Sequence, residues 1–185
     1  MIVAIIVLVI LLIIPAGYII SQYNGLVALR NHIKESWADI DTELKRRYDL
    51  IPNLVETVKG YAAHEQATLQ SVIELRNQAA ANNGTVAEQS SSERALVAGM
   101  QKLMAVVEAY PDLKASENFL ELQRELTNTE DRIQASRRFY NANVRDYTIK
   151  RETFPSNLVA SMFNFQPADY FEVDEAVREN PKVEL

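Results

Sequence analysis

The fold is decided by the stretch LKASENFLELQRELTNTEDRIQASRRFYNANVRDYTIKRETF, residues 113–154. Its apolar residues recur mostly at intervals of three, four or seven, which is the spacing of one face of a helix. Pro155 then ends the pattern, because proline cannot continue the hydrogen bonds of a helix. About forty residues at 1.5 Å each give a helix of roughly 60 Å. So long a helix in so short a chain needs partners of similar length, which predicts an all-α protein.

Two other periodic runs can supply those partners. In residues 26–75 the apolar side chains lie three and four residues apart, but Pro52 interrupts the run and Asp49 could cap a new helix. We therefore expect a kink or short break near Leu50. The second run covers residues 93–108. The expected result is an antiparallel bundle of long helices that cross at about 20°.

The connections follow from residues that break helices. Residues 79–92 read AAANNGTVAEQSSS and have no periodic apolar residues, so they are expected to form the main exposed loop. A turn is expected at residues 110–112, which contain a proline. The segment 155–163 is expected to add a short final helix. The last residues, 166–185, carry six acidic side chains against only two basic ones, Arg178 and Lys182, and are expected to form a loosely docked or disordered arm.

The N-terminus carries a candidate membrane anchor. Residues 1–29 contain no charged side chain, and residues 2–20 are almost wholly aliphatic. A helix of this length can cross a hydrocarbon core about 30 Å thick, and Pro15 and Gly17 are expected to kink it. A cleavable signal peptide would begin with basic residues, and a core helix would need partners on all sides. We therefore interpret residues 1–22 as an uncleaved anchor in the lipid bilayer.

The residues after the anchor predict its orientation. Tyr18 and Tyr23 are expected at the membrane interface, where amphipathic aromatic rings are favoured. Basic residues follow the anchor, whereas its N-terminal side has only the amino terminus. The positive-inside rule therefore predicts that the helical domain, residues 23–165, lies in the cytoplasm. The basic residues are Arg30, Lys34, Lys45, Arg46 and Arg47.

Composition excludes several classes of function. The formal net charge of −6 argues against a general nucleic-acid binder, which would need a basic surface. The absence of cysteine excludes disulfides, thiolate metal sites and a cysteine nucleophile. The two histidines, His32 and His64, are too far apart in sequence for a local metal pair, and the HEQAT segment lacks the second histidine of a zinc helix. We therefore expect no metal, cofactor or catalytic residue.

The densest polar cluster lies on the long stretch. Glu130 or Asp131 could act as a base beside Arg137 and Arg138 as an anion clamp. The favoured interpretation is that these charges brace the helix and its neighbours. The basic triplet 45–47, with Arg46 and Arg47, is expected to pair with this acidic cluster rather than with lipid. The aromatic residues at helical spacing are expected to pack in the core: Trp37, Phe119, Phe139, Tyr140 and Tyr147.

Four segments carry a family resemblance. They are YNGLVALRN at residues 23–31, ESWADIDTELKRRYDLIPNLVETVKGYAAHE at 35–65, ENFLELQRELTNTEDRIQASRRFYNANV at 117–144, and FPSNLVASMF at 154–163, followed by YFE. In these segments the chain resembles the LemA family of bacterial membrane proteins over nearly its whole length. The resemblance implies an N-terminal transmembrane helix and an antiparallel helical bundle on the cytoplasmic side of the bacterial inner (plasma) membrane.

The departures from the family pattern are minor. Tyr48 stands where members often have histidine, Thr148 where asparagine is common, and Asn164 where glycine usually separates two phenylalanines. These residues argue further against a histidine-based site. The resemblance implies no established reaction. It implies an association with envelope membranes and neighbouring membrane proteases and, in one branch, with the formation of magnetosome membranes.

These observations favour a membrane-anchored scaffold that forms homo-oligomers and organises or remodels the envelope membrane. The alternative is a non-catalytic adaptor that holds a membrane protease or another envelope protein through its acidic tail or loop. An enzyme that uses the cluster at residues 130–138 is the least favoured interpretation. The residues expected to be structural or to make contacts are Trp37, Arg46, Arg47, Pro52, Glu130, Asp131, Arg137, Arg138 and Tyr140.

Overall fold

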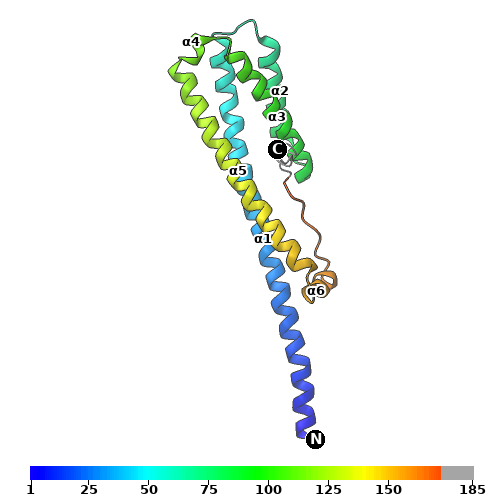
Figure 1. Cartoon of the computed structure of the whole chain (residues 1–185). Coiled ribbons are helices and arrows are strands. Elements are labelled where there is room, and N and C mark those ends of the chain that lie inside the picture. Colours follow the sequence, from blue (N-terminus) through cyan, green and yellow to red (C-terminus); the bar gives the residue numbers. More distant parts are fainter. Residues whose placement is uncertain (172–185) are drawn as a thin grey trace, which may run out of the picture. The chain divides into compact units, whose positions relative to one another are not determined.

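The computed structural model describes residues 1–171, apart from the side chains of Ala4 and Leu8. Every regular element in this part of the chain is a helix, which confirms the all-α prediction (Figure 1). The helices are α1 (Ile2–Lys59), α2 (Gln66–Ala81), α3 (Val86–Val107), α4 (Pro111–Lys114), α5 (Glu117–Glu152) and α6 (Ser156–Met162).

The chain divides into two compact units, and the two longest helices contribute to both. The anchor unit contains Met1–Ala38 and Arg138–Ala168, and the bundle unit contains Asp39–Arg137 together with the described residues 169–171. Each unit is described by itself below. The domain boundaries expected at residues 22 and 165 mark the end of the membrane anchor and the start of the acidic tail. The division into compact units does not test them, so they stay predictions.

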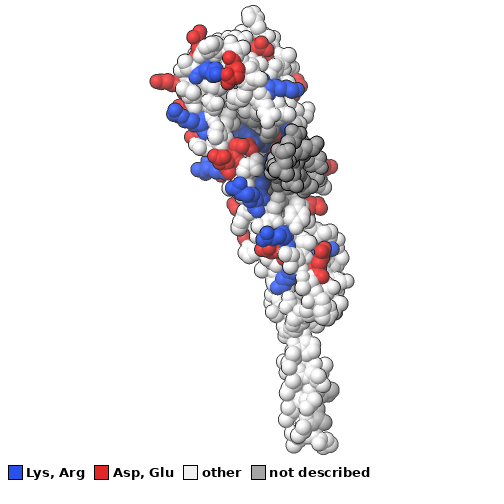
Figure 2. Space-filling view, viewed as in Figure 1, with Lys and Arg blue, Asp and Glu red and all other residues white. Residues whose placement is uncertain are grey.

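In the anchor unit, α1 runs without interruption from the apolar segment through Gly25. The apolar segment has a mean hydropathy of 2.5 over an 18-residue window, none of which is buried against the rest of the chain. Figure 2 shows no charged side chain on the visible face of this part of α1. An exposed apolar helix of this length fits a single membrane span.

The remainder of the anchor unit packs around the next turns of α1. Leu26 of α1, Tyr147 of α5, Ala160 of α6 and the following Phe165 form a small buried core. Residues Val27, Leu29, Ile33 and Ala168 pack against it. The short helix expected over 155–163 is therefore present as α6, and its buried face holds it on α1 (Figure 1).

The bundle unit has a larger core supplied by α1, α2, α3 and α5. In this unit α2 lies beside α3, and the end of α1 lies beside the start of α5 (Figure 1). The apolar positions three and four residues apart point inward, as the periodicity predicts. The core includes Ile40, Leu44, Ile51, Leu54 and Val58 of α1, Leu69 and Val72 of α2, Leu96 and Leu103 of α3, and Phe119, Leu126 and Ile133 of α5.

A kink or short break was expected near Leu50; the chain has no break there, because α1 continues through Pro52 to Lys59, and the kink stays a prediction. The chain turns instead after Gly60, where the amide of Ala62 donates to the Val58 carbonyl at 2.8 Å. The helical run expected over residues 26–75 is thus two helices, α1 and α2. The apolar spacing in the sequence did not reveal the turn, because Ala62 and Leu69, on either side of the start of α2, are both buried in the core.

The loop expected over residues 79–92 is much shorter. α3 begins at Val86, with Thr85 as its N-cap: the Thr85 hydroxyl accepts from the Glu88 amide, and the Glu88 carboxylate accepts from the Thr85 amide. This reciprocal pair satisfies amide groups that the first helical turn leaves free. The polar residues after it are therefore helical, and Gln89 and Ser90 are buried.

Two smaller expectations also changed. Phe139 was expected in the core but is 59% exposed, because it lies about 100° around α5 from its buried neighbour Tyr140. The arm expected over residues 166–185 begins as an ordered segment, since Phe171 is 1% exposed. The part of that arm from residue 172 onward lies outside the described residues.

Candidate functional site

A buried arginine organises the bundle unit. Arg47 of α1 is only 4% exposed and forms an ion pair with Glu93 of α3, which is completely buried. The Arg47 Nη1 atom also donates to the Oε2 atom of Glu130 on α5 at 2.8 Å. A charge removed from water is costly unless it is paired and hydrogen-bonded. These three side chains, the Arg47 cluster, therefore connect α1, α3 and α5.

Two neutral side chains donate hydrogen bonds to the Oε1 atom of Glu93. The Tyr48 hydroxyl donates to its carboxylate, and the Gln89 amide donates to the same carboxylate at 3.0 Å. The Gln89 amide also lies 3.1 Å from the Tyr48 hydroxyl. Burial raises the pKa of the Tyr48 hydroxyl, and the nearby Arg47 charge opposes that rise. Tyr48 therefore stays a neutral donor to Glu93 at neutral pH.

Arg76 explains how α1 passes through a proline. Pro52 has no amide hydrogen, so the Tyr48 carbonyl, four residues earlier, loses its usual helical donor. The Arg76 Nε atom of α2 donates to that carbonyl at 2.9 Å. The site left open by the proline is thus used to attach α2 to α1.

The sequence-predicted charges of α5 do not form one group. Glu130 joins the Arg47 cluster, whereas Asp131 and Arg138 are exposed. The Arg137 guanidinium lies 4.4 Å from the centre of the Phe171 ring, a cation–π arrangement. The base and anion clamp considered for residues 130–138 are therefore not assembled around one position.

The basic triplet behaves as expected only in part. Arg47 pairs with Glu130 of the long helix, but its buried partner Glu93 lies on α3. Arg46 is exposed and lies 3.7 Å from Glu43 on its own helix. Arg132 of α5 also approaches Glu43, at 3.7 Å. The expected bracing between α1 and α5 is present, with a third helix that the expectation did not include.

A cavity of about 400 Å³ lies beside the Arg47 cluster. Arg47 and Glu130 line it, but they pair with each other there. Its other walls are mainly aliphatic and thioether side chains, and among residues 1–171 no group of three or more His, Asp or Glu residues is placed to hold a metal ion. The geometry is that of a structural brace beside an apolar cavity. The other lining residues are Leu96, Val97, Met100, Gln101, Met104, Leu126 and Thr127.

The anchor unit contains an aromatic group around Tyr23, here called the collar. The Tyr23 ring makes edge contacts with Phe163 at 4.8 Å and with Phe165 at 5.6 Å between ring centres. The Arg30 guanidinium lies 5.5 Å from the centre of the Phe165 ring. Tyr23, predicted at the membrane interface, is thus fixed against the segment after α6. Tyr18, the other predicted interface residue, is 37% exposed.

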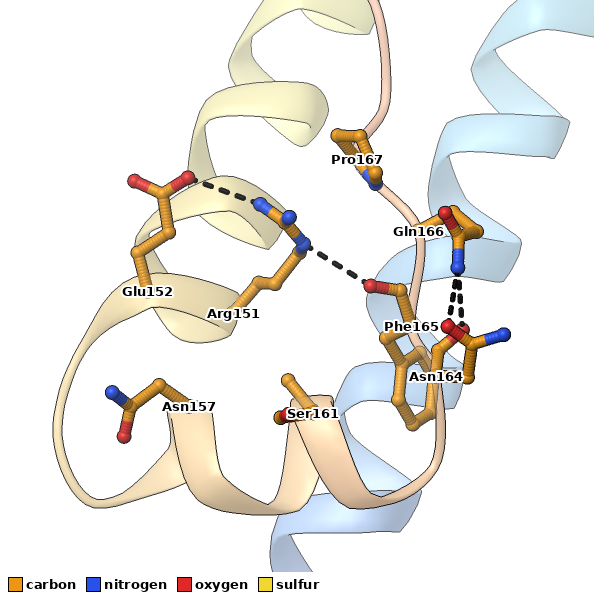
Figure 3. A pocket seen from close by; sticks show the side chains of 9 residues that line it. Arg151, Glu152, Asn157, Ser161, Asn164, Phe165, Gln166 and Pro167 are labelled. Atoms are coloured by element: carbon orange, nitrogen blue, oxygen red, sulfur yellow. Dashed lines mark hydrogen bonds and ion pairs between the residues drawn. The ribbon is translucent and has the colours of Figure 1, made fainter.

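The segment after α6 is held to α5 by backbone contacts. The Tyr147 hydroxyl donates to the Gln166 carbonyl at 2.6 Å, and the Arg151 Nε atom donates to the Phe165 carbonyl at 3.1 Å. Figure 3 shows Arg151, Glu152 and the residues after α6 around a pocket of about 490 Å³. The Arg151 guanidinium also bonds Glu152 at 3.0 Å. The Arg151 guanidinium is therefore already bonded to groups of the protein itself.

Trp37 and Tyr140 were expected to pack in the core; Tyr140 is buried, Trp37 is partly buried, and their rings are in contact. Their ring centres lie 5.6 Å apart in an edge arrangement that joins α1 to α5 within the anchor unit. Sequence reasoning missed Gln89 and Glu93, because both were assigned to a loop or to the very start of a helix. The T-x-x-E pattern at residues 85–88 was the available signal. It begins α3 early enough to place residues 89, 93 and 96 on one face.

A family profile and several relatives match this chain. The profile described as "LemA family" matches residues 36–185. The magnetosome protein MamQ 2 of Paramagnetospirillum magneticum is 25% identical, with 83% of this chain and 66% of that protein covered. This chain therefore spans just under two thirds of the length of that relative.

Two other relatives give similar results. Protein LemA of Metamycoplasma hominis is 28% identical, with 86% of this chain and 73% of the relative covered. The magnetosome protein MamQ of Magnetospirillum gryphiswaldense is 22% identical, with 83% of this chain and 65% of the relative covered. Together with the apolar first helix, these likenesses indicate a membrane-associated helical protein.

Proposed function

The chain belongs to the LemA family, and we propose that it is a membrane-anchored helical scaffold that associates with copies of itself. In this proposal it organises or remodels the envelope membrane of a bacterium. The anchor crosses the inner (plasma) membrane, and the remaining residues lie in the cytoplasm. The basic residues Arg30 and Lys34, soon after an uncharged N-terminus, support this orientation.

The observation that carries the proposal is the continuity of α1. The apolar segment and the first helix of the soluble part are one helix, Ile2–Lys59, with no linker between them. In the anchor unit, α5 and α6 also pack on the turns that directly follow the apolar segment. The direction of the anchor is thus tied to packed protein. Association between neighbouring copies would therefore set how their anchors stand in the bilayer.

The construction of the bundle unit also supports a mechanical role. Arg47, Glu93 and Glu130 join three helices, and Arg76 joins α2 to α1. These contacts favour one arrangement of the helices, since partners left unpaired inside the bundle would be costly. The names of the magnetosome relatives support a role at a membrane, although those names concern the relatives themselves.

The adaptor alternative has one observation in its favour. The cavity beside the Arg47 cluster has apolar walls, including Met100, Met104 and Leu126, which could receive a side chain of another protein. Methionine side chains adapt readily to different partners. This alternative predicts contacts with a different protein and needs no contact between copies.

Cross-linking in native membranes separates the two functions. The chain has no cysteine, so single substitutions at exposed positions such as Ser71→Cys, Lys102→Cys and Glu121→Cys each give one reactive site. The scaffold predicts cross-linked dimers of this chain at some positions, and the same pattern after removal of residues 172–185. Cross-links to other proteins alone, with no dimers at any position, would instead establish the adaptor.

A further inference from the structure

An exposed apolar surface remains on the anchor unit outside the membrane span. Phe154, Leu158 and Met162 are spaced four residues apart and are 74%, 58% and 67% exposed, and the adjacent Phe163 is 48% exposed. These four residues are here called the α6 surface. Leu158 and Met162 lie one turn apart on one face of α6, whereas Phe154 lies in the turn before α6 and Phe163 follows its last residue. Large apolar side chains grouped in this way mark an interaction surface more often than isolated ones do.

The other face of α6 is already covered by protein. Val159 and Ala160 are each 3% exposed, and Ala160 belongs to the core that contains Leu26 of α1. The α6 surface therefore cannot become buried by turning α6 over, because that turn would expose Val159 and Ala160. Its cover must come from outside the described residues of this unit.

The collar fixes the level of α6 relative to the membrane span. Residues 2–20 form about 28 Å of helix, which matches the thickness of a hydrocarbon core of about 30 Å. Tyr23 lies three residues, or about 4.5 Å, beyond Ile20. The headgroup layer on each side of the core is about 5–8 Å thick. Phe163, in ring contact with Tyr23, therefore lies at the level of the headgroups.

Basic side chains lie at the same level. The Lys150 side chain lies against the backbone of Gly25, two residues beyond Tyr23, where any larger residue would collide with its ammonium group. The anchor unit as a whole has six basic and three acidic residues, a formal net charge of +3, whereas the complete chain has −6. The unit that carries the anchor is thus the one that suits a negatively charged lipid surface.

We propose that α6 is an interfacial membrane helix, which inserts Phe154, Leu158, Met162 and Phe163 into the headgroup region of an anionic leaflet. Amphipathic helices bind in this way when apolar side chains enter the headgroup boundary and basic groups remain near the lipid phosphates. The single anchor then gains a second contact with the same leaflet. The inference concerns each copy of the chain and does not depend on self-association.

Spin labels on the full-length chain test this proposal directly. Leu158→Cys and Met162→Cys would each be labelled with a nitroxide and reconstituted in vesicles of phosphatidylglycerol and phosphatidylcholine. Collisions with oxygen, which concentrates in lipid, would be compared with collisions with a water-soluble nickel complex. The matched control is Tyr61→Cys, an aromatic residue of the bundle unit that is 48% exposed.

We expect oxygen to dominate several-fold at both α6 positions and the nickel complex to dominate at position 61. Equal accessibility to nickel at positions 158, 162 and 61 would overturn the proposal, because α6 would then face water. Low accessibility to both reagents would also overturn it, since a protein surface would then cover α6. Cross-linking between copies is a separate measurement, so failure here would leave the scaffold proposal intact.

The lipid charge has its own test. In vesicles of phosphatidylcholine alone, the same labels should lie closer to water, because Lys150 loses its attraction to the surface. Lys150→Gln should produce the same shift in anionic vesicles. An equal depth in both lipids would overturn the assignment to an anionic leaflet.

Discussion

The two units differ in what they bury and what they leave exposed. In the bundle unit a charged pair, Arg47 and Glu93, is removed from water and enclosed by protein. In the anchor unit large apolar residues such as Met162 and Phe154 remain uncovered at the surface. The first arrangement is complete within the chain, whereas the second needs an environment that the chain does not supply. The difference indicates that the bilayer, rather than another helix, completes the anchor unit.

The largest predicted effect comes from removing the buried cation. Arg47→Ala leaves Glu93 charged and buried without its ion pair, so we expect a loss of about 3–5 kcal/mol in the free energy of unfolding. Denaturant unfolding of the detergent-solubilised chain, followed by circular dichroism, measures this change. Arg46→Ala is the control, because Arg46 is exposed and should contribute less than about 1 kcal/mol. Equal effects of the two changes would contradict the Arg47 cluster as a brace.

Tyr48→Phe tests the neutral donor in the same cluster. Removing its hydroxyl leaves Glu93 without one hydrogen bond, so we expect a loss of about 1–3 kcal/mol at neutral pH. The measurement is again denaturant unfolding.

The same variant also has a predicted pH dependence. Burial raises the pKa of Tyr48 in the folded chain. The stability that the neutral hydroxyl contributes is therefore complete below the ordinary tyrosine pKa of about 10, and it is lost as the pH rises through the pKa of the folded state. Stability should therefore fall less steeply above about pH 10 in Tyr48→Phe than in the unchanged chain. The pKa of Tyr147 is also raised by burial, so some alkaline loss should remain. Identical slopes in both chains would contradict the assignment.

A double-mutant cycle tests the contact that accommodates Pro52. Arg76→Ala should cost about 1–2 kcal/mol, because the Tyr48 carbonyl would have no donor. In a Pro52→Ala background the alanine amide can donate to that carbonyl, so the cost of Arg76→Ala should become smaller. The same cost in both backgrounds would show that Arg76 stabilises the bundle in some other way.

The smallest effect is predicted for the exposed face of α6. Leu158→Ala should change the free energy of unfolding in detergent by less than about 0.5 kcal/mol, because the side chain is 58% exposed. Its buried neighbour is the matched control: Val159→Ala should cost about 1.5–3 kcal/mol. A large effect of Leu158→Ala would indicate that protein covers this residue, and the contrast between the units would weaken.

The helices were predictable where periodicity alone decides the structure. The long stretch now seen as α5, the apolar start of α1 and the short α6 all follow from spacing and proline positions. The ends of the helices were not predictable, because each depends on a single contact. Pro52 stays helical because Arg76, 24 residues later, supplies a donor, and no local rule anticipates such a partner.

Only part of the Arg47 cluster was predictable from the sequence. Arg47 and Glu130 were expected to meet, since opposite charges on neighbouring long helices attract. Glu93 was missed because its polar surroundings resemble a loop, and only the cap at Thr85 shows that it belongs to a helix. The exposed α6 residues were expected as part of a short helix, but their exposure depends on how that helix packs against α1.

The central claim, a scaffold built from copies of one anchored chain, is tested most directly by mass. The full-length chain would be extracted in a mild detergent, and its particle mass would be measured by light scattering beside that of a chain shortened to begin at Tyr23. Large, uniform particles that depend on the anchor are the predicted result. A monomer in both preparations would contradict the scaffold and transfer the question to the partner of an adaptor.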